Sequence, residues 1–71
     1  MSKKPIIWKR PDGSTVSCTE KIKVLQQNLD ELRQIAQDAF EDALLMECDE
    51  SQIRAVFQDL IDSLENPYKQ D

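Results

Sequence analysis

Histidine is absent from this 71-residue sequence, glycine occurs once, at Gly13, and cysteine occurs twice. Without histidine the chain lacks the usual base of nucleophilic catalysis and the usual nitrogen ligand of carboxylate-bridged metal sites. A single glycine also excludes the glycine-rich loops that bind phosphate groups. The sequence therefore predicts a protein that is not an enzyme and that holds no metal, no other cofactor and no evident small-molecule substrate.

Long apolar runs are missing as well. No stretch approaches the roughly 20 consecutive apolar residues of a membrane-spanning helix. Near the N-terminus only Ile6, Ile7 and Trp8 stand together before charged residues resume, whereas the core of a signal peptide needs about 7 to 15 apolar residues. We therefore expect a cytoplasmic protein with no membrane contact, in which Cys18 and Cys48 are reduced thiols.

Charged residues are abundant and unevenly placed along the chain. The sequence has 14 acidic and 9 basic residues and a net charge of −5. Residues 1–19 contain four basic residues and one acidic residue, a balance of +3. Residues 20–48 contain seven acidic and three basic residues, and residues 49–71 six and two, so each balance is −4. Because 71 residues are too few for two cores, we expect one domain, 1–71, in which a basic arm precedes an acidic body.

The residues before the first helix predict a β-hairpin over residues 5–18. β-forming residues flank the sequence Pro-Asp-Gly at 11–13, which suits a type I turn followed by a left-handed residue. The register that follows places Trp8 opposite Val16 and makes one face of the hairpin apolar. A two-stranded hairpin is marginal by itself in water, so this one is expected to pack against another element.

A long helix is predicted over about residues 20–48, with Thr19 as its N-cap. Apolar residues recur there at alternating intervals of three and four, which is the a/d seam of a coiled coil over four heptads. The seam consists of Ile22, Leu25, Leu29, Leu32, Ala36, Ala39, Ala43 and Met46. Further apolar residues widen this seam toward its C-terminal half, which favours packing against more than one element.

A shorter helix is predicted over about residues 50–65, capped by Asp49 and stopped before Pro67. Since few residues separate the two helices, they are expected to form an antiparallel helical hairpin. The predicted fold class is thus mainly α (α+β), an N-terminal β-hairpin followed by a helical hairpin, with residues 1–4 and 67–71 disordered. The alternative is an all-α two-helix hairpin that has a disordered N-terminal arm and dimerises as a four-helix bundle.

The two predicted helices differ in length, about 43 Å against about 24 Å at 1.5 Å per residue. The shorter helix leaves the N-terminal half of the long one without cover. Because burial of each exposed leucine or isoleucine there stabilises by roughly 1.5–3 kcal/mol, we expect the β-hairpin, a second copy of the chain, or both to cover it. The candidate interaction surface consists of Trp8, Lys9, Arg10, Ile22, Leu25, Leu29 and Leu32.

The leading functional hypothesis is a non-enzymatic protein–protein interaction module whose partner is another protein or a second copy. The alternative is a small regulator that binds nucleic acid through the basic hairpin, where Lys3, Lys4, Lys9 and Arg10 interleave with Trp8. Acidic two-helix proteins of this size are a common bacterial type, but that likeness of fold predicts no function. The sequence alone thus predicts an architecture and a surface, not a biological process.

Overall fold

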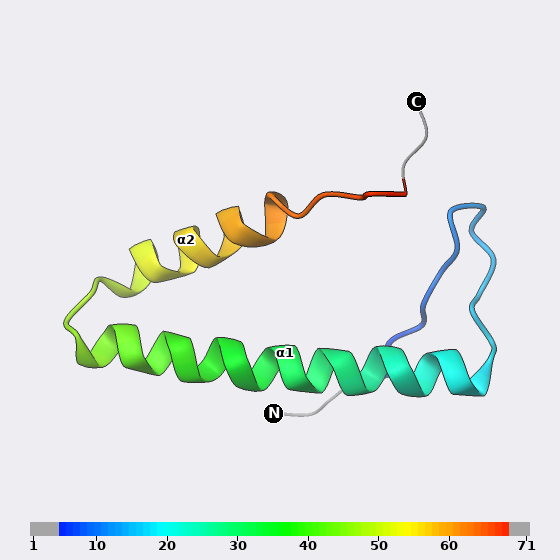
Figure 1. The fold of residues 1–71 in the computed structure, drawn as a ribbon, viewed down its shortest axis with the longest axis horizontal. Helices are drawn as coiled ribbons and strands as arrows, with labels where there is room; N and C mark the ends of the chain where they lie inside the picture. The colour runs from blue at the N-terminus through cyan, green and yellow to red at the C-terminus, as the bar shows by residue number, and fades with distance from the viewer. Residues whose placement is uncertain (1–4, 69–71) are drawn as a thin grey trace. The chain divides into compact units, whose positions relative to one another are not determined.

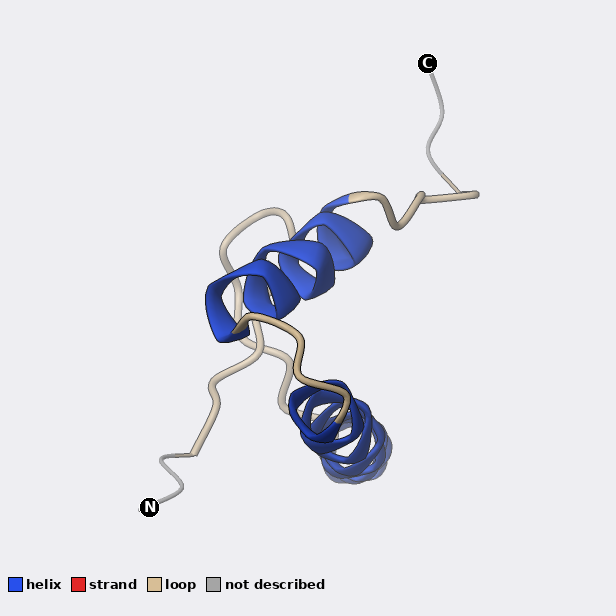
Figure 2. Cartoon of the chain, turned by 90° about the vertical axis from the view of Figure 1, so that its left-hand side faces the viewer, coloured by secondary structure: helices blue, strands red, loops and turns tan. Residues whose placement is uncertain are grey.

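The computed structural model describes residues 5–68, which form two helices, α1 (Thr19–Leu45) and α2 (Glu50–Asp62) (Figure 1). The described part of the chain contains no strand, so the fold is mainly α (Figure 2). The chain divides into two compact units, unit 1 (residues 1–35) and unit 2 (residues 36–71), and α1 contributes to both. Each unit is described by itself below.

The helix α1 begins one residue earlier than predicted, and its N-cap is Cys18 rather than Thr19. The backbone carbonyl of Cys18 accepts the first helical hydrogen bond, from the N–H of Ile22 at 3.0 Å. Cys18 therefore occupies the position just before the first residue of the helix. A hydroxyl is the commoner capping acceptor, which is why the sequence favours Thr19.

The same helix ends at Leu45, three residues before the predicted end, through a Schellman motif around Glu47. Glu47 adopts a left-handed conformation, with φ 66°, and its N–H donates to the carbonyl of Leu44 at 3.0 Å. The N–H of Cys48 donates to the carbonyl of Ala43 at 3.1 Å, which completes the motif. Glycine usually occupies the left-handed position, so a glutamate there gives no signal in the sequence.

The predicted β-hairpin over residues 5–18 has its turn but not its strands. Gly13 takes a left-handed conformation, with φ 88°, and its N–H donates to the carbonyl of Arg10 at 2.9 Å. The N–H of Arg10 donates to the carbonyl of Ser14 at 2.8 Å, and Oδ1 of Asp12 accepts from the N–H of Ser14 at 2.9 Å. The turn chemistry predicted from the sequence is therefore present.

Beyond this turn the pairing stops early, so no strand forms within the described residues. An isolated antiparallel bridge joins Lys9 to Thr15, and the N–H of Val16 donates to the carbonyl of Trp8 at 2.9 Å, in the predicted register. Two short segments with no third strand beside them are marginal in water, which explains why the ladder does not extend. The β part of the predicted fold class is therefore wrong, and the mainly α part is confirmed.

The second helix begins as predicted after the N-cap Asp49, whose side chain accepts a hydrogen bond from the N–H of Gln52 at 3.0 Å. It ends at Asp62, three residues earlier than predicted, with Ser63 as its C-cap. The N–H of Ser63 donates to the carbonyl of Asp59 at 3.0 Å. The N-terminal cap of α2 is thus confirmed, and its predicted C-terminal end is too late.

Disorder was expected at both ends of the chain, and residues 1–4 and 69–71 lie outside the described residues. Residues 67 and 68 form a turn, in which the N–H of Tyr68 donates to the side-chain oxygen of Asn66 at 2.8 Å. Residues 67 and 68 therefore have a defined conformation, although disorder was predicted from residue 67 onward.

Unit 2 contains the one buried side chain among residues 5–68, that of Ile53, which is 5% exposed. Here α2 packs against the last turns of α1. Phe40 of α1 and Phe57 of α2 meet edge to face, with ring centroids 6.4 Å apart. The guanidinium of Arg54 lies 4.7 Å from the centroid of the Phe40 ring, and this contact adds a cation–π attraction to the aromatic pair.

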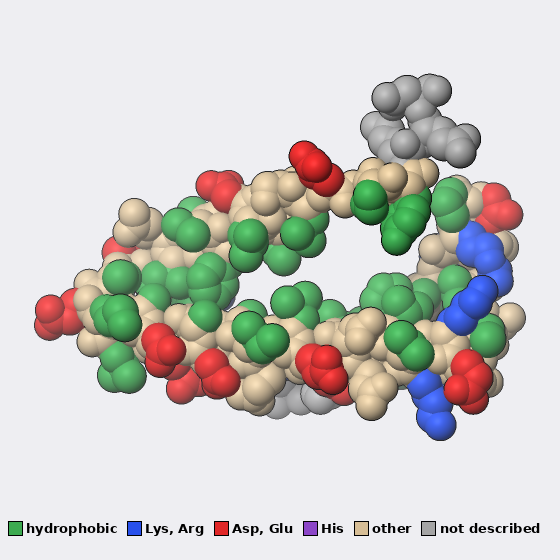
Figure 3. All heavy atoms as spheres, viewed as in Figure 1, with side chains coloured by type: hydrophobic (Ala, Val, Ile, Leu, Met, Phe, Trp, Pro, Cys, Tyr) green, Lys and Arg blue, Asp and Glu red, His purple; other side chains and the backbone are tan. Residues whose placement is uncertain are grey.

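Hydrophobic side chains remain at the surface of both helices (Figure 3). In the described part of the chain, fourteen large apolar side chains are more than a third exposed. No helix there combines the length and the apolar character that a membrane span requires. The candidate functional site is therefore sought in this exposed apolar surface.

Candidate interaction surface

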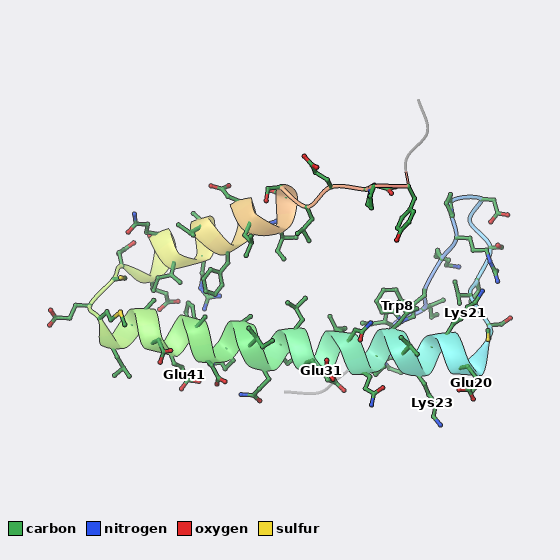
Figure 4. All side chains as sticks on the ribbon, viewed as in Figure 1. Trp8, Glu20, Lys21, Lys23, Glu31 and Glu41 are labelled. Atoms are coloured by element: carbon green, nitrogen blue, oxygen red, sulfur yellow. The ribbon has the colours of Figure 1, made fainter. Side chains whose placement is uncertain are left out.

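The segment before α1 lies against the first turns of that helix. A shallow hollow with almost entirely apolar walls forms there, lined by Val16, Glu20, Lys21, Val24 and Leu25. Trp8 lies beside α1 (Figure 4) and is half-buried. Within unit 1, the N-terminal segment therefore covers part of the helix face that the sequence leaves open.

The predicted apolar surface residues divide into a covered set and an open set. Trp8, Leu25 and Leu29 are half-buried, and Val16 of the N-terminal segment lines the same hollow as Leu25. Ile22 is 36% exposed and Leu32 is 51% exposed. The apolar surface that stays available to a partner is thus narrower at the start of α1 than predicted, and it is displaced toward Leu32.

Two exposed apolar residues of α1 are absent from the predicted interaction surface. Val24 is 54% exposed and Ile35 is 67% exposed, and both lie one position before a residue of the a/d seam. A helical-wheel projection of the sequence could have found them. At 100° per residue they lie within a strip of the helix surface about 80° wide that also contains three residues of the a/d seam. This strip also carries the polar residues Lys21, Asn28 and Asp42. We call its apolar members the α1 stripe; they are Val24, Leu32, Ile35 and Ala39 within α1 and Met46 just beyond its end.

The two basic residues of the predicted surface are exposed but already engaged within the turn. The guanidinium of Arg10 donates to the carbonyl of Thr15 at 2.8 Å and to Oγ of Ser14 at 3.3 Å. Nζ of Lys9 donates to Oγ1 of Thr15 at 3.4 Å. Hydrogen bonds from the side chain and then the backbone of Ser14 lower the pKa of Asp12, which favours a negative charge beside these bases.

Both cysteines are exposed free thiols. Backbone hydrogen bonds from Lys21 and then Glu20 lower the pKa of the Cys18 thiol below its ordinary value of 9.0, and the charge of Lys21 adds to the effect. A helix N-terminus stabilises a thiolate in this way. Across residues 5–68, no three cysteine or acidic side chains come together as a metal-binding group.

The apolar face of α2 is largely open as well. Its N-terminal part carries buried Ile53 and half-buried Phe57. Farther along α2, Leu60 is 60% exposed and Ile61 is 46% exposed, and just beyond its end Leu64 is 69% exposed. Within unit 2, the helix pair therefore closes only near the loop that connects its two helices.

No protein-family model matches this chain, and no curated protein and no solved structure shows significant similarity to it. The function is therefore argued from the surface itself. Three features carry that argument: the exposed α1 stripe, the partly covered start of α1, and the turn that displays Lys9 and Arg10.

Proposed function

We propose that this chain is a small, non-enzymatic protein–protein interaction module of the cytoplasm. The observation that supports the proposal is the shortage of buried side chains. Among residues 5–68, only Ile53 is buried, while fourteen large apolar side chains are exposed. Exposed apolar surface on this scale marks binding sites in soluble proteins, since burying each such side chain stabilises a complex by roughly 1.5–3 kcal/mol.

In unit 1 the proposed contact surface is the open apolar face of α1. Its exposed part consists of Ile22, Val24, Leu32 and Ile35. Trp8, which is the only tryptophan of the chain, lies at the margin of this surface beside α1 (Figure 4). Its fluorescence therefore reports both the packing of the N-terminal segment and the approach of a partner.

A capture experiment with two matched variants tests this proposal. The chain is immobilised, incubated with a native extract or with free copies of itself, and the bound protein is measured. Leu32→Glu adds a charge to the surface, whereas Gln27→Glu adds the same charge to α1 about 140° away around the helix. We expect the first variant to lose its partner and the second to keep it. Equal capture by all three chains, or none by the wild type, would contradict the proposal.

Nucleic-acid binding stays a prediction that rests on the exposure of Lys9 and Arg10 on the turn. Two further bases, Lys3 and Lys4, lie outside the described residues. Such binding weakens steeply with salt and should be lost when Lys9 and Arg10 are both replaced by glutamate. The absence of any binding to single- or double-stranded nucleic acid at low salt would remove this alternative.

A further inference from the structure

We propose that the open apolar face of α2 docks a basic amphipathic helix of another protein. We call this surface the α2 face; it consists of Val56, Phe57, Leu60 and Ile61 within α2 and Leu64 just beyond its end. It belongs to unit 2, whereas the contact surface proposed above belongs to unit 1. The inference rests on the proposed interaction function and adds to it a second surface and the chemistry of its partner.

The α2 face is a continuous apolar strip. At 100° per residue, its four helical members and buried Ile53 span about 140° of the helix surface. The one other residue of α2 in this strip is Glu50, which stands in the first turn and pairs with Arg54, with Oε2 and Nε 3.1 Å apart. Beyond the first turn of α2, the strip therefore carries no charged side chain.

Within unit 2, the last turns of α1 cover only the beginning of the α2 face. Phe57 packs edge to face on Phe40 of α1 and is half-buried. The exposed fractions of the other members are 55%, 60%, 46% and 69% for Val56, Leu60, Ile61 and Leu64. Because α2 has 13 residues and is about 20 Å long, a partner helix of about four turns is long enough to cover it.

The described part of unit 2 is strongly acidic. Residues 36–68 contain nine acidic residues and one basic residue, Arg54, a balance of −8. All nine acidic side chains are exposed, and the guanidinium of Arg54 is already engaged by Glu50 and by the ring of Phe40, whose centroid is 4.7 Å away. This negative potential attracts a cationic partner to the α2 face. It repels a second copy of unit 2, a nucleic acid or an anionic membrane.

The C-terminal ends of both helices lack the positive charge that would stabilise them. A helix C-terminus carries a partial negative charge, which basic side chains stabilise. Neither α1 nor α2 has a basic residue in its last turn, and α2 carries Asp59 and Asp62 there instead. Cationic side chains from a partner would offset this unfavourable arrangement. The helix dipole thus favours a basic partner independently of the net charge.

Asp59 borders the α2 face, where the flanking residues of a docked helix would lie. It stands about 60° around the helix from Val56, and Asp62 stands farther round, on the far side of α2. Lysine and arginine have long stems that cover apolar surface while their charged ends reach such carboxylates. The expected partner is therefore a helix with apolar residues at intervals of three and four and with lysine or arginine beside them.

Fluorescence anisotropy with a designed peptide tests the inference on the full chain. The probe is a labelled peptide of about 18 residues, or five helical turns, with leucines along one face and lysines around the rest. One control peptide has glutamate in place of every lysine, and the other has the same composition with its leucines dispersed around the helix. We expect the chain to bind the probe at least about tenfold more tightly than either control, and less tightly as salt is raised.

Leu60→Gln locates the site on α2 without a change of charge. Leu60 is 60% exposed, so the helical circular dichroism should persist. The dissociation constant for the probe should rise about tenfold, as expected for the loss of one buried leucine, and Leu64→Gln should act in the same direction. The matched control is Val24→Gln in unit 1, where Val24 is 54% exposed, and it should bind the probe as the wild type does.

A double variant, Asp59→Asn with Asp62→Asn, separates attraction of the partner from a structural role. Asparagine keeps an acceptor for the hydrogen bond that Nε2 of Gln58 donates to Oδ1 of Asp62 at 3.0 Å. We expect the variant to bind the probe about three- to tenfold more weakly, yet to unfold at a higher temperature because its helix C-terminus is less negative. Glu20→Gln with Glu31→Gln removes the same charge from unit 1 and should change the affinity by less than about twofold.

The contrary outcomes are distinct. A wild type that binds the probe no better than the glutamate peptide, or a Leu60→Gln chain that binds it as well as the wild type, overturns the inference. A chain that self-associates through Leu60 and excludes the probe overturns it as well, since a second copy then occupies the face. If the probe does not bind but capture through Leu32 persists, the interaction module stands without this partner; if both fail, the proposed function fails too.

Discussion

Unit 1 and unit 2 share α1, yet only unit 2 has a buried side chain among the residues that the structure describes. In unit 2 the helix meets α2, a capped helix with an apolar face of its own, and Ile53 is 5% exposed. In unit 1 the same helix meets a turn with a single bridge, and Leu25 and Leu29 are only half-buried. An apolar helix face thus becomes a core only where a second regular element brings an apolar face to it.

Among the variants that test this comparison, truncation of Ile53 should change the free energy of unfolding most. Ile53→Ala is expected to lower the free energy of unfolding by about 2–4 kcal/mol, because buried methyl groups are lost and a cavity remains. Leu25→Ala in unit 1 should cost less, about 1–2 kcal/mol, because that side chain is already half-exposed. Urea unfolding at one fixed protein concentration measures both values. Equal losses would show that the two units are equally well packed, contrary to the structure.

The next largest effect is expected at Glu47, which holds the end of α1 in a left-handed conformation. Glu47→Gly should raise the free energy of unfolding by about 1 kcal/mol, since glycine adopts this conformation without the penalty of a Cβ atom. The same urea unfolding experiment measures the gain. A loss of stability would indicate that the left-handed conformation is not the one present in solution.

Gly13 provides the control in unit 1, because it has the other positive φ value among residues 5–68. A Cβ atom added there would meet nothing within 4 Å, so Gly13→Ala tests the backbone conformation alone. We expect it to destabilise the turn by about 1 kcal/mol, the opposite sign to Glu47→Gly. Chemical shifts of the turn residues report this change even where global unfolding does not.

Acid should weaken both units, because each has an aspartate whose pKa is lowered. Hydrogen bonds from the side chain and then the backbone of Ser14 lower the pKa of Asp12, and those from the side chain of Ser51 and then the backbone of Gln52 lower the pKa of Asp49. A carboxylate whose pKa is lower in the folded state stabilises fully above its unfolded value, and the stabilisation is lost as the pH falls through the folded value. The loss should therefore occur below the ordinary value of 3.8.

Asparagine variants separate the two units in this acid transition. Asp12→Asn and Asp49→Asn keep a side-chain acceptor and remove the charge, so each should flatten the pH dependence of its own unit. Trp8 emission follows the turn of unit 1, and ellipticity at 222 nm follows the helices. The interpretation fails if Asp12→Asn alters the acid dependence of the helical signal as much as Asp49→Asn does.

The smallest effect concerns the thiols and leaves stability unchanged. The pKa of Cys18 is lowered by backbone hydrogen bonds from Lys21 and then Glu20, so a larger fraction of this thiol is ionised near neutral pH. We expect iodoacetamide to modify Cys18 severalfold faster than Cys48 in the folded chain, measured by peptide mass spectrometry. The difference should disappear in urea, and faster reaction at Cys48 would contradict the capping geometry.

The features that follow from local chemistry were predictable from the sequence. Asp49 caps α2 because a carboxylate accepts from free backbone N–H groups, and Gly13 closes the turn because it tolerates positive φ. The interruption-free apolar seam predicted α1 as one long helix. Each of these predictions depends on residues within a few positions of each other, and each is confirmed.

The errors arise where the deciding interaction leaves no mark in residue type. Glu47 ends α1 in a left-handed position that glycine usually holds, and Cys18 rather than Thr19 precedes the first residue of that helix. The strands around the turn fail because no third strand lies beside them, which is a tertiary fact. Val24 and Ile35 are absent from the predicted surface because only seam residues of the long helix were included in it, although further apolar residues were expected beside the seam.

The scarcity of buried side chains has a calorimetric consequence. Unfolding raises the heat capacity in proportion to the apolar area newly exposed, by about 12–15 cal/mol/K per residue in well-packed domains. A single copy of this chain, with Ile53 as the one buried side chain of its described part, should show a smaller increment and a broad thermogram. Binding of a partner would bury the missing area, so the melting temperature should rise with the concentration of that partner. A titration series of thermograms would then measure how much of the core is supplied by another molecule.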